Sequence, residues 1–186
     1  GSIGSLVESD KLAFRVDFDG AAMPVTSRMY WRGLTLSSFD GRTWRPRGNQ
    51  PEWLQRQEAA RAQAGTLREW RYTVTLEPTQ RPWLFALAVP YSDERAVGHV
   101  YDQSLRAPAP VKTLTRYRVT SVEGMPRDPE LPAWLRDDNL QLPDDAAPRA
   151  RQWALQERAE LPSDEAYAAR VLQWFAEDGF SYTLSP

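Results

Sequence analysis

The residues best able to do chemistry are few, and the first of them is a single histidine. His99 is the only histidine among the 186 residues, and the chain has no cysteine. A thiol nucleophile, a disulfide, a zinc finger and a site with several histidines are therefore excluded. Asp93 and Asp102 lie close to His99 in sequence and could orient it, but no Gly-x-Ser-x-Gly segment supplies a nucleophilic serine. We interpret His99 as a strand or loop histidine bonded to the backbone or to water.

Two pairs of neighbouring aspartates are the other candidates for catalysis. Glycoside hydrolysis needs two carboxyl groups held a short distance apart across a sugar. Asp137-Asp138 and Asp144-Asp145 are adjacent in loop-like sequence, where capping a helix or facing solvent explains them better. The chain has neither a glycine-rich phosphate loop nor a calcium-loop motif. The sequence therefore predicts no catalytic, cofactor-binding or metal-ligating residue, and no cofactor.

The charges are nearly balanced, with 23 basic and 25 acidic side chains and a formal net charge of −2. That balance gives no general attraction to nucleic acid, so we expect no nucleic-acid partner. The basic residues are arginine except for Lys11 and Lys112, which we attribute to codon bias. No run approaches the roughly 20 apolar residues of a membrane span, and no signal-peptide pattern is present.

Tryptophan is abundant, with eight residues of this type. Exposed tryptophans on a sheet can stack on sugar rings, because they combine apolar area with a polar edge. Trp31, Trp70 and Trp83 lie at alternating strand positions, for which packing in the core is the more common explanation. Trp44, beside a predicted hairpin, and Trp53, in a predicted insertion, are the better candidates for exposed ligand-binding or interface aromatics.

The first two thirds of the chain have the pattern of short strands. Residues 11–19 and 70–76 alternate between apolar and polar side chains, as in half-buried strands, and residues 83–89 are continuously apolar, as in a strand covered on both faces. Asp40-Gly41 predicts a tight hairpin with positive φ at both residues, which would make Phe39 and Trp44 cross-strand neighbours. Further strands are predicted at residues 30–36, 100–105 and 112–122, with an insertion at residues 45–66.

After Gly124 the strand-like pattern ends and is followed by a proline-rich segment and then by helical patterns. Residues 125–147 are rich in proline and indicate a connector, whose Trp134, Leu135, Leu140 and Leu142 would dock it. Pro148 is placed to begin a helix, and Ser163 to cap a second one with Asp164 and Glu165 in its first turn. Tyr167, Val171, Trp174 and Phe175 form the apolar stripe of that helix, and Gly179 ends it. Two helices and an extended segment at residues 180–184 cannot close a core, so we interpret residues 148–186 as an incomplete domain.

We therefore expect a mainly β (α+β) fold. Residues 1–10 would be a linker or tag, and residues 11–124 an antiparallel β-sandwich, Ig-like or open-barrel domain.

Several segments, in this order, resemble the bacterial membrane-anchored transglutaminase-like proteins of the TgpA type. The match extends over nearly the whole chain, and the insertion at 45–66 is its least similar part. The matching segments are Leu12-Ala13-Phe14-Arg15-Val16, Phe18-Asp19-Gly20, Tyr30-Trp31-Arg32-Gly33, Phe39-Asp40-Gly41-Arg42-Thr43-Trp44, Tyr72 to Thr79, Trp83 to Leu87, Leu140-Gln141-Leu142-Pro143, Pro148-Arg149 and Phe180-Ser181-Tyr182-Thr183-Leu184.

The resemblance implies a polytopic inner-membrane parent protein with a large periplasmic region. That region would begin with this β-rich domain and continue into a papain-like transglutaminase core, of which residues 148–186 would hold the first two helices. A Cys-His-Asp triad would form a thioester with a glutamine side chain of a protein or peptide substrate, and an amine or water would resolve it. We expect the triad beyond Pro186, so the parent would be an enzyme and this chain alone would not. His99 is not assigned to the triad.

Three readings of the function remain open. In the first, the chain positions the catalytic core and shapes its cleft, at the periplasmic face of the inner membrane. In the second, it is an aromatic-rich module that binds cell-wall glycan or peptide. In the third, it is a plain scaffold domain. The resemblance also leaves open whether the parent acts as a transglutaminase or as a protease-like hydrolase, and whether Pro186 is a chosen end or a proteolytic one.

Overall fold

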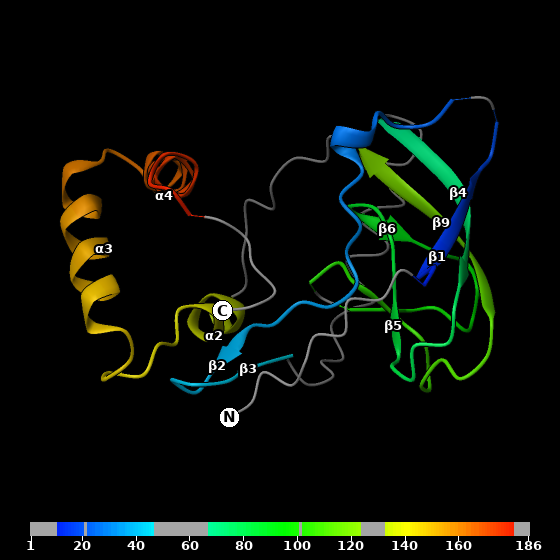
Figure 1. Ribbon diagram of the computed structural model, residues 1–186, viewed down its shortest axis with the longest axis horizontal. Coiled ribbons are helices and arrows are strands. Elements are labelled where there is room, and N and C mark those ends of the chain that lie inside the picture. The colour runs from blue at the N-terminus through cyan, green and yellow to red at the C-terminus, as the bar shows by residue number, and fades with distance from the viewer. Residues whose placement is uncertain (1–10, 21, 47–66, 101, 124–132, 181–186) are drawn as a thin grey trace. The chain divides into compact units, whose positions relative to one another are not determined.

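The computed structural model describes residues 11–20, 22–46, 67–100, 102–123 and 133–180 (Figure 1). These residues form mostly short antiparallel strands followed by helices. They divide into two compact units, which we describe separately. The first holds residues 10–39 and 44–141, and the second holds residues 1–9, 40–43 and 142–186.

The largest sheet is built from the two longest strands, and its order is β1-β4-β9-β6. All of its described pairings are antiparallel. The strands predicted at residues 11–19, 70–76 and 112–122 are confirmed in position, because each range overlaps a strand of this sheet. The four strands are β1 (Phe14–Phe18), β4 (Arg68–Leu76), β6 (Pro90–Tyr91) and β9 (Thr115–Glu123).

A smaller sheet has the order β5-β8-β7, with β5 at Trp83–Leu84, β7 at Gly98–His99 and β8 at Leu105–Arg106. The strand predicted over residues 83–89 is therefore wrong beyond its first two residues. Ala86 makes a single bridge to Arg32, and Val89 takes a positive φ of 52°, which a strand does not tolerate. The strand predicted at residues 30–36 is reduced to the same bridge. A short 3-10 turn, η1 (Thr26–Arg28), precedes it.

The core lies on the inner face of β4 and β9. Tyr72, Val74 and Leu76 of β4 are buried with Tyr117 and Val119 of β9. The smaller sheet and its flanking loops add Leu84, Ala86, Leu87, Val97, Leu105 and Val111. Trp31 and Trp70 pack against this cluster, as interpreted from the sequence, and the Trp31 ring meets the Tyr72 ring edge-on at 5.6 Å. Trp83 is half-buried, with the Arg106 guanidinium 4.9 Å from its ring.

The predicted hairpin exists, but its turn is longer than expected. Strand β2 (Ser38–Phe39) pairs with β3 (Trp44–Arg45), and Phe39 lies opposite Trp44. The loop thus has four residues, 40–43, and of the Asp40-Gly41 pair only Gly41 has a positive φ, at 92°. Asp40 instead uses its side chain, whose Oδ1 accepts hydrogen bonds from the backbone N–H groups of Arg42 (3.0 Å) and Thr43 (2.7 Å). This local side-chain turn replaces the second positive φ.

Three helices follow the strands among the described residues. Helix α2 (Ala133–Asn139) was not predicted, and of the four expected docking residues of the connector it buries Leu135, while Leu140 and Leu142 are exposed. Helix α3 (Pro148–Glu160) begins at the predicted proline, and α4 (Asp164–Glu177) begins after the predicted Ser163. Gly179 has a φ of 72°, as expected of a residue that ends a helix. In the described residues no helix is long and apolar enough to cross a membrane.

The sheets that the structure describes are open, and their strands are short except for β4 and β9. A mainly antiparallel fold with helices is thus confirmed. Closure of these sheets into a sandwich or an Ig-like arrangement stays a prediction, as do the domain boundaries expected at residues 124 and 147.

Candidate functional site

The histidine singled out by the sequence has a structural partner. His99 lies in β7, and its Nε2 atom accepts a hydrogen bond from the backbone N–H of Ser92 at 3.1 Å. A nitrogen that accepts carries no proton, so this contact requires the neutral ring. Asp102 stabilises its own loop, because its Oδ1 accepts from the N–H and the hydroxyl of Ser104 at 2.9 and 2.6 Å, and its Oδ2 accepts from the Thr35 hydroxyl. These contacts agree with the interpretation of His99 as a backbone-bonded residue.

Of the two aromatic candidates, Trp44 and Trp53, the structure describes only Trp44. Trp44 is 55% exposed and stacks on Phe39 with 4.7 Å between ring centroids. Trp53 and most of the insertion at 45–66 lie outside the described residues. Asp144 and Asp145 are exposed in the turn that precedes α3. Among the residues that the structure describes, no group of three or more histidine, aspartate or glutamate side chains could hold a metal ion.

Two buried tyrosine hydroxyls bind backbone groups of the segment between β5 and β6. The sequence analysis did not single out either residue. The Tyr117 hydroxyl accepts from the N–H of Phe85 at 2.8 Å and lies 2.9 Å from its carbonyl oxygen. The Tyr72 hydroxyl accepts from the N–H of Leu87 at 2.9 Å and lies 2.8 Å from the Ser121 hydroxyl, which donates to the Leu87 carbonyl. Burial raises the pKa of Tyr72 to about 12 and that of Tyr117 further still. Both hydroxyls are therefore neutral near pH 7 and serve here as hydrogen-bond partners of backbone groups.

The outer face of the large sheet carries a polar pocket of about 500 Å³. Arg71 of β4 and Arg118 of β9 point to this face, since they alternate with the buried Tyr72 and Tyr117. One wall is the segment that follows β6. The lining residues are Asp19, Arg71, Tyr72, Tyr91, Ser92, Asp93, Glu94, Arg118, Val119 and Thr120.

The wall of this pocket is fixed to β9 by side chains. Ser92 Oγ donates to the carbonyl oxygen of Arg118 at 2.7 Å, and Glu94 Oε1 accepts from the N–H of the same residue at 3.0 Å. Strand β6 pairs with β9 only at Ser121 and Thr120. Beyond the end of that pairing, the side chains of Ser92 and Glu94 satisfy the backbone C=O and N–H of Arg118 in place of a strand. His99 holds the N–H of Ser92 in turn.

The helical unit offers a second, apolar pocket of about 740 Å³ along α3 and α4. Trp153 of α3 stacks on Trp174 of α4 with 4.4 Å between ring centroids. Phe180 meets the rings of both Trp174 and Phe175 edge-on, at 4.8 and 5.2 Å. Neither helix contains a fully buried residue, and Phe175 is 49% exposed. The predicted apolar stripe thus exists, with Tyr167, Val171 and Trp174 partly buried and Phe175 exposed.

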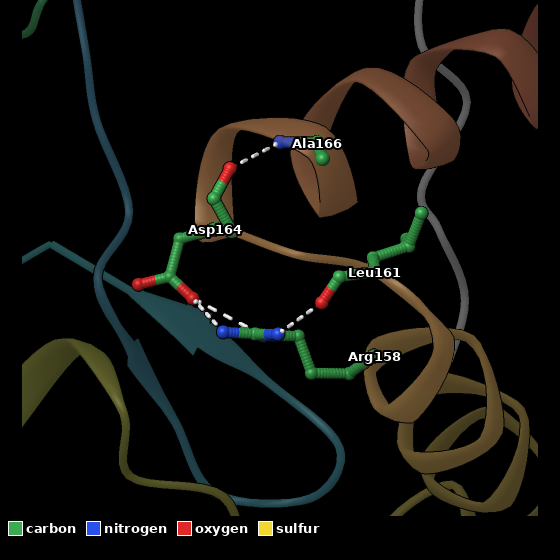
Figure 2. A network of polar contacts seen from close by, with 5 residues as sticks. Arg158, Leu161, Asp164 and Ala166 are labelled. Carbon is green, nitrogen blue, oxygen red and sulfur yellow. Dashed lines mark hydrogen bonds and ion pairs between the residues drawn. The ribbon is translucent and has the colours of Figure 1, made fainter.

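Polar contacts at the junction of the two helices fix their connection (Figure 2). Arg158 of α3 binds the carboxylate of Asp164 through Nε (3.1 Å) and Nη2 (2.8 Å), and its Nη1 donates to the carbonyl of Leu161 at 3.0 Å. Ser163 accepts from the N–H of Ala166 at 3.2 Å, the capping bond expected from the sequence. Further along, Arg170 pairs with Glu157 at 2.9 Å.

Comparisons with known proteins give consistent results. The family described as "TgpA N-terminal domain" matches residues 1–128. A protein-glutamine gamma-glutamyltransferase of Pseudomonas aeruginosa is 38% identical over all 186 residues, which span only 27% of that protein. Two crystal structures of the periplasmic domain of TgpA from the same organism, one bound to ethylmercury, have TM-scores of 0.80 and 0.82 at 35% identity. Each match covers 96% of this chain and 61% or 60% of the solved one.

Proposed function

This chain belongs to the TgpA N-terminal domain family, and from that membership we propose that it is the non-catalytic, N-terminal periplasmic part of a protein-glutamine gamma-glutamyltransferase. The sequence contains no cysteine, so a cysteine nucleophile would come from the remainder of a longer polypeptide. That polypeptide would be anchored in the inner membrane and act on glutamine-bearing proteins or peptides. A sandwich-like domain at residues 11–124 would position the catalytic core, to which residues 148–186 would contribute the first two helices.

The incompletely buried apolar face of α3 and α4, on which Phe175 and Phe180 are exposed, is the observation that carries this proposal. Stable helices in globular proteins owe most of their stability to packing of an apolar face, and this pair contains no fully buried side chain. Its aromatic cluster of Trp153, Trp174, Phe175 and Phe180 is continuous, and two of its rings, Phe175 and Phe180, are about half-exposed. We therefore assign this face to contact with the catalytic core, which would bury it and thereby fix the N-terminal part to the active site.

An activity assay tests whether catalysis requires the remainder of the longer protein. Amine incorporation into a glutamine donor is expected from a longer protein that includes the remainder of the periplasmic region, and not from the 186 residues alone. If the 186 residues catalyse the reaction by themselves, the non-catalytic assignment is wrong. A longer protein that hydrolyses the glutamine amide without incorporating amine would identify the parent as a hydrolase instead.

A second experiment tests the docking face. Phe175→Glu should strongly lower the melting temperature of the longer protein and leave that of the 186-residue chain little changed, because Phe175 is half-exposed here. Gln156→Glu on the exposed surface of α3 adds the same charge away from the pocket and serves as the matched control. Hydrogen exchange should show residues 145–180 less protected in the short chain than in the longer protein. Equal protection in both would contradict burial by the core.

A binding function for the exposed hairpin aromatics is the second candidate. Trp44 stacks on Phe39 and keeps half of its surface accessible, as a sugar-stacking platform requires. Titration with peptidoglycan fragments, followed by tryptophan fluorescence, should then saturate, and Trp44→Ala should abolish the response. Since seven other tryptophans contribute to the signal, Trp31→Phe, at a core-packed site, is the control.

A further inference from the structure

We propose that the polar pocket on the outer face of the large sheet binds a small dipolar ligand, namely a short peptide with a free carboxylate and a free ammonium group. Its volume of about 500 Å³ falls within the range of small-molecule sites, roughly 300–1,000 Å³. This assignment does not depend on the proposed function, because it uses only residues of the sheet and its adjoining loop.

The two guanidinium groups supply the carboxylate half of the site. Arg71 lies opposite Thr120 in the register, and Arg118 lies opposite Thr73, so the two arginines are diagonal neighbours on adjacent strands. Diagonal positions are about 7–8 Å apart, which long side chains bridge easily. Both side chains are well exposed and lie at the same pocket, so both can reach one carboxylate.

The present partners of the arginines would not be left unpaired if a ligand engaged them. Glu69 pairs with Arg71 at 3.0 Å but also accepts from the Tyr91 hydroxyl at 3.3 Å. Glu94 lies 3.6 Å from the Arg118 Nε, a loose ion pair, while its Oε1 accepts from the Arg118 N–H at 3.0 Å. Each glutamate therefore keeps another hydrogen bond, and each guanidinium has further N–H groups to donate.

The acidic lining sets the charge of the ligand. Asp19, Asp93 and Glu94 share the pocket with two arginines, so a purely anionic ligand meets repulsion as well as attraction. A molecule that carries both charges satisfies both halves of the lining. The wall that bears Asp93 and Glu94 is held by the contacts of Ser92 with Arg118 and His99, so two of the three acidic lining residues lie on a segment that is fixed before binding.

Calorimetric titration with three probes tests the assignment without any mutation. Diglycine carries both charges, diglycinamide lacks the carboxylate, and N-acetyl-diglycine lacks the ammonium group. Saturable binding of diglycine is expected, with at least about tenfold weaker binding of each of the other two, the effect of losing a hydrogen bond to a charged group. Equal binding of all three, or of none, would overturn the proposal.

Variants then locate the site. Arg118→Gln and Arg71→Gln should each weaken diglycine binding by about tenfold. Arg15→Gln, on β1 and outside the pocket, should leave it unchanged. Amide chemical shifts of residues 91–94 and 118–120 should move on titration in the unmodified protein. Binding that survives both pocket variants, or shift changes confined to other residues, would place the ligand elsewhere and refute the site.

Discussion

The hydroxyl of Tyr117 lies 2.8 Å from the backbone nitrogen and 2.9 Å from the carbonyl oxygen of the same residue, Phe85. One side chain thus satisfies both peptide groups that a neighbouring strand would otherwise pair. Tyr72 and Ser121 do the same for Leu87. The segment after β5 can therefore cross the core without belonging to a sheet, because its buried polar groups have partners.

Removing the Tyr117 hydroxyl should destabilise the β-rich unit. Tyr117→Phe leaves the N–H and C=O of Phe85 without this partner, at a cost of about 2–4 kcal/mol for burying unsatisfied polar groups. Urea denaturation followed by circular dichroism measures the change. Tyr30→Phe is the control, since that ring is 69% exposed. A loss of less than about 1 kcal/mol would mean that water replaces the hydroxyl.

Alkaline pH should unfold the same unit through its buried tyrosines. Burial raises the pKa of Tyr72 from 10.0 to about 12, so an unfolded chain releases this proton at lower pH than the folded one. The stabilisation is complete below pH 10 and is lost as the pH rises toward 12. Ultraviolet titration of tyrosinate, run in parallel with thermal melts, checks this. Tyr72→Phe should make the melting temperature less sensitive to pH in that window.

The sequence predicts the position of a strand or helix where a local pattern of side chains is enough to determine it. Alternation places β1, β4 and β9, and Ser163 with its acidic neighbours places the start of α4. The apolar run after Trp83 misleads, because its hydrogen-bond partners are hydroxyls from residues 72 and 117, distant in sequence. The prolines in residues 125–147 led to the prediction of a connector, so the short helix α2 was not predicted. Ser121 lies on the same face of β9 as the buried Tyr117 and Val119. A serine at such a core position was the one signal in the sequence that a buried hydroxyl binds the backbone of the segment after Trp83.

The candidate sites were harder to foresee, because they depend on register. Arg71 and Arg118 are 47 positions apart and meet only through the pairing of β4 with β9. The capping of Arg118 by Ser92 and Glu94 depends on where β6 stops. By contrast, the helical stripe was predictable, since Tyr167, Val171, Trp174 and Phe175 follow one periodicity on one element.

Loss of the helix cap should loosen α4 alone. Ser163→Ala removes the hydrogen bond to the N–H of Ala166 and should lower the stability of the helix by about 1 kcal/mol. Hydrogen exchange of residues 164–168 should speed up about fivefold, while that of β4 and β9 stays unchanged. Ser163→Asp, which can still cap, is the matched control. Unchanged exchange in the alanine variant would show that Arg158 and Asp164, and not Ser163, hold this end.

Acid should weaken the contact between η1 and the end of β9. Hydrogen bonds from Arg28 and then from Trp70 hold the pKa of Glu123 below its usual 4.5. That stabilisation is present above pH 4.5 and is lost as the pH falls through the lowered value. The effect should be under about 1 kcal/mol because the pair lies at the surface. Glu123→Gln should show a flatter dependence of melting temperature on acid pH, and an unchanged slope would mean that other carboxylates dominate.

The absence of a side chain at Gly33 should prove essential for packing of the Phe85 ring. A Cβ atom at this position would lie 2.6 Å from Cε1 of Phe85, which stacks on Phe14 with 4.9 Å between centroids and cannot move freely. Gly33→Ala should therefore cost about 1–3 kcal/mol, as overpacking does in a filled core. Shortening the ring partner to leucine in the double variant G33A/F85L should restore part of that loss relative to the sum of the single changes. Additive losses would place the strain in the backbone of Gly33 instead of in its contact with the ring.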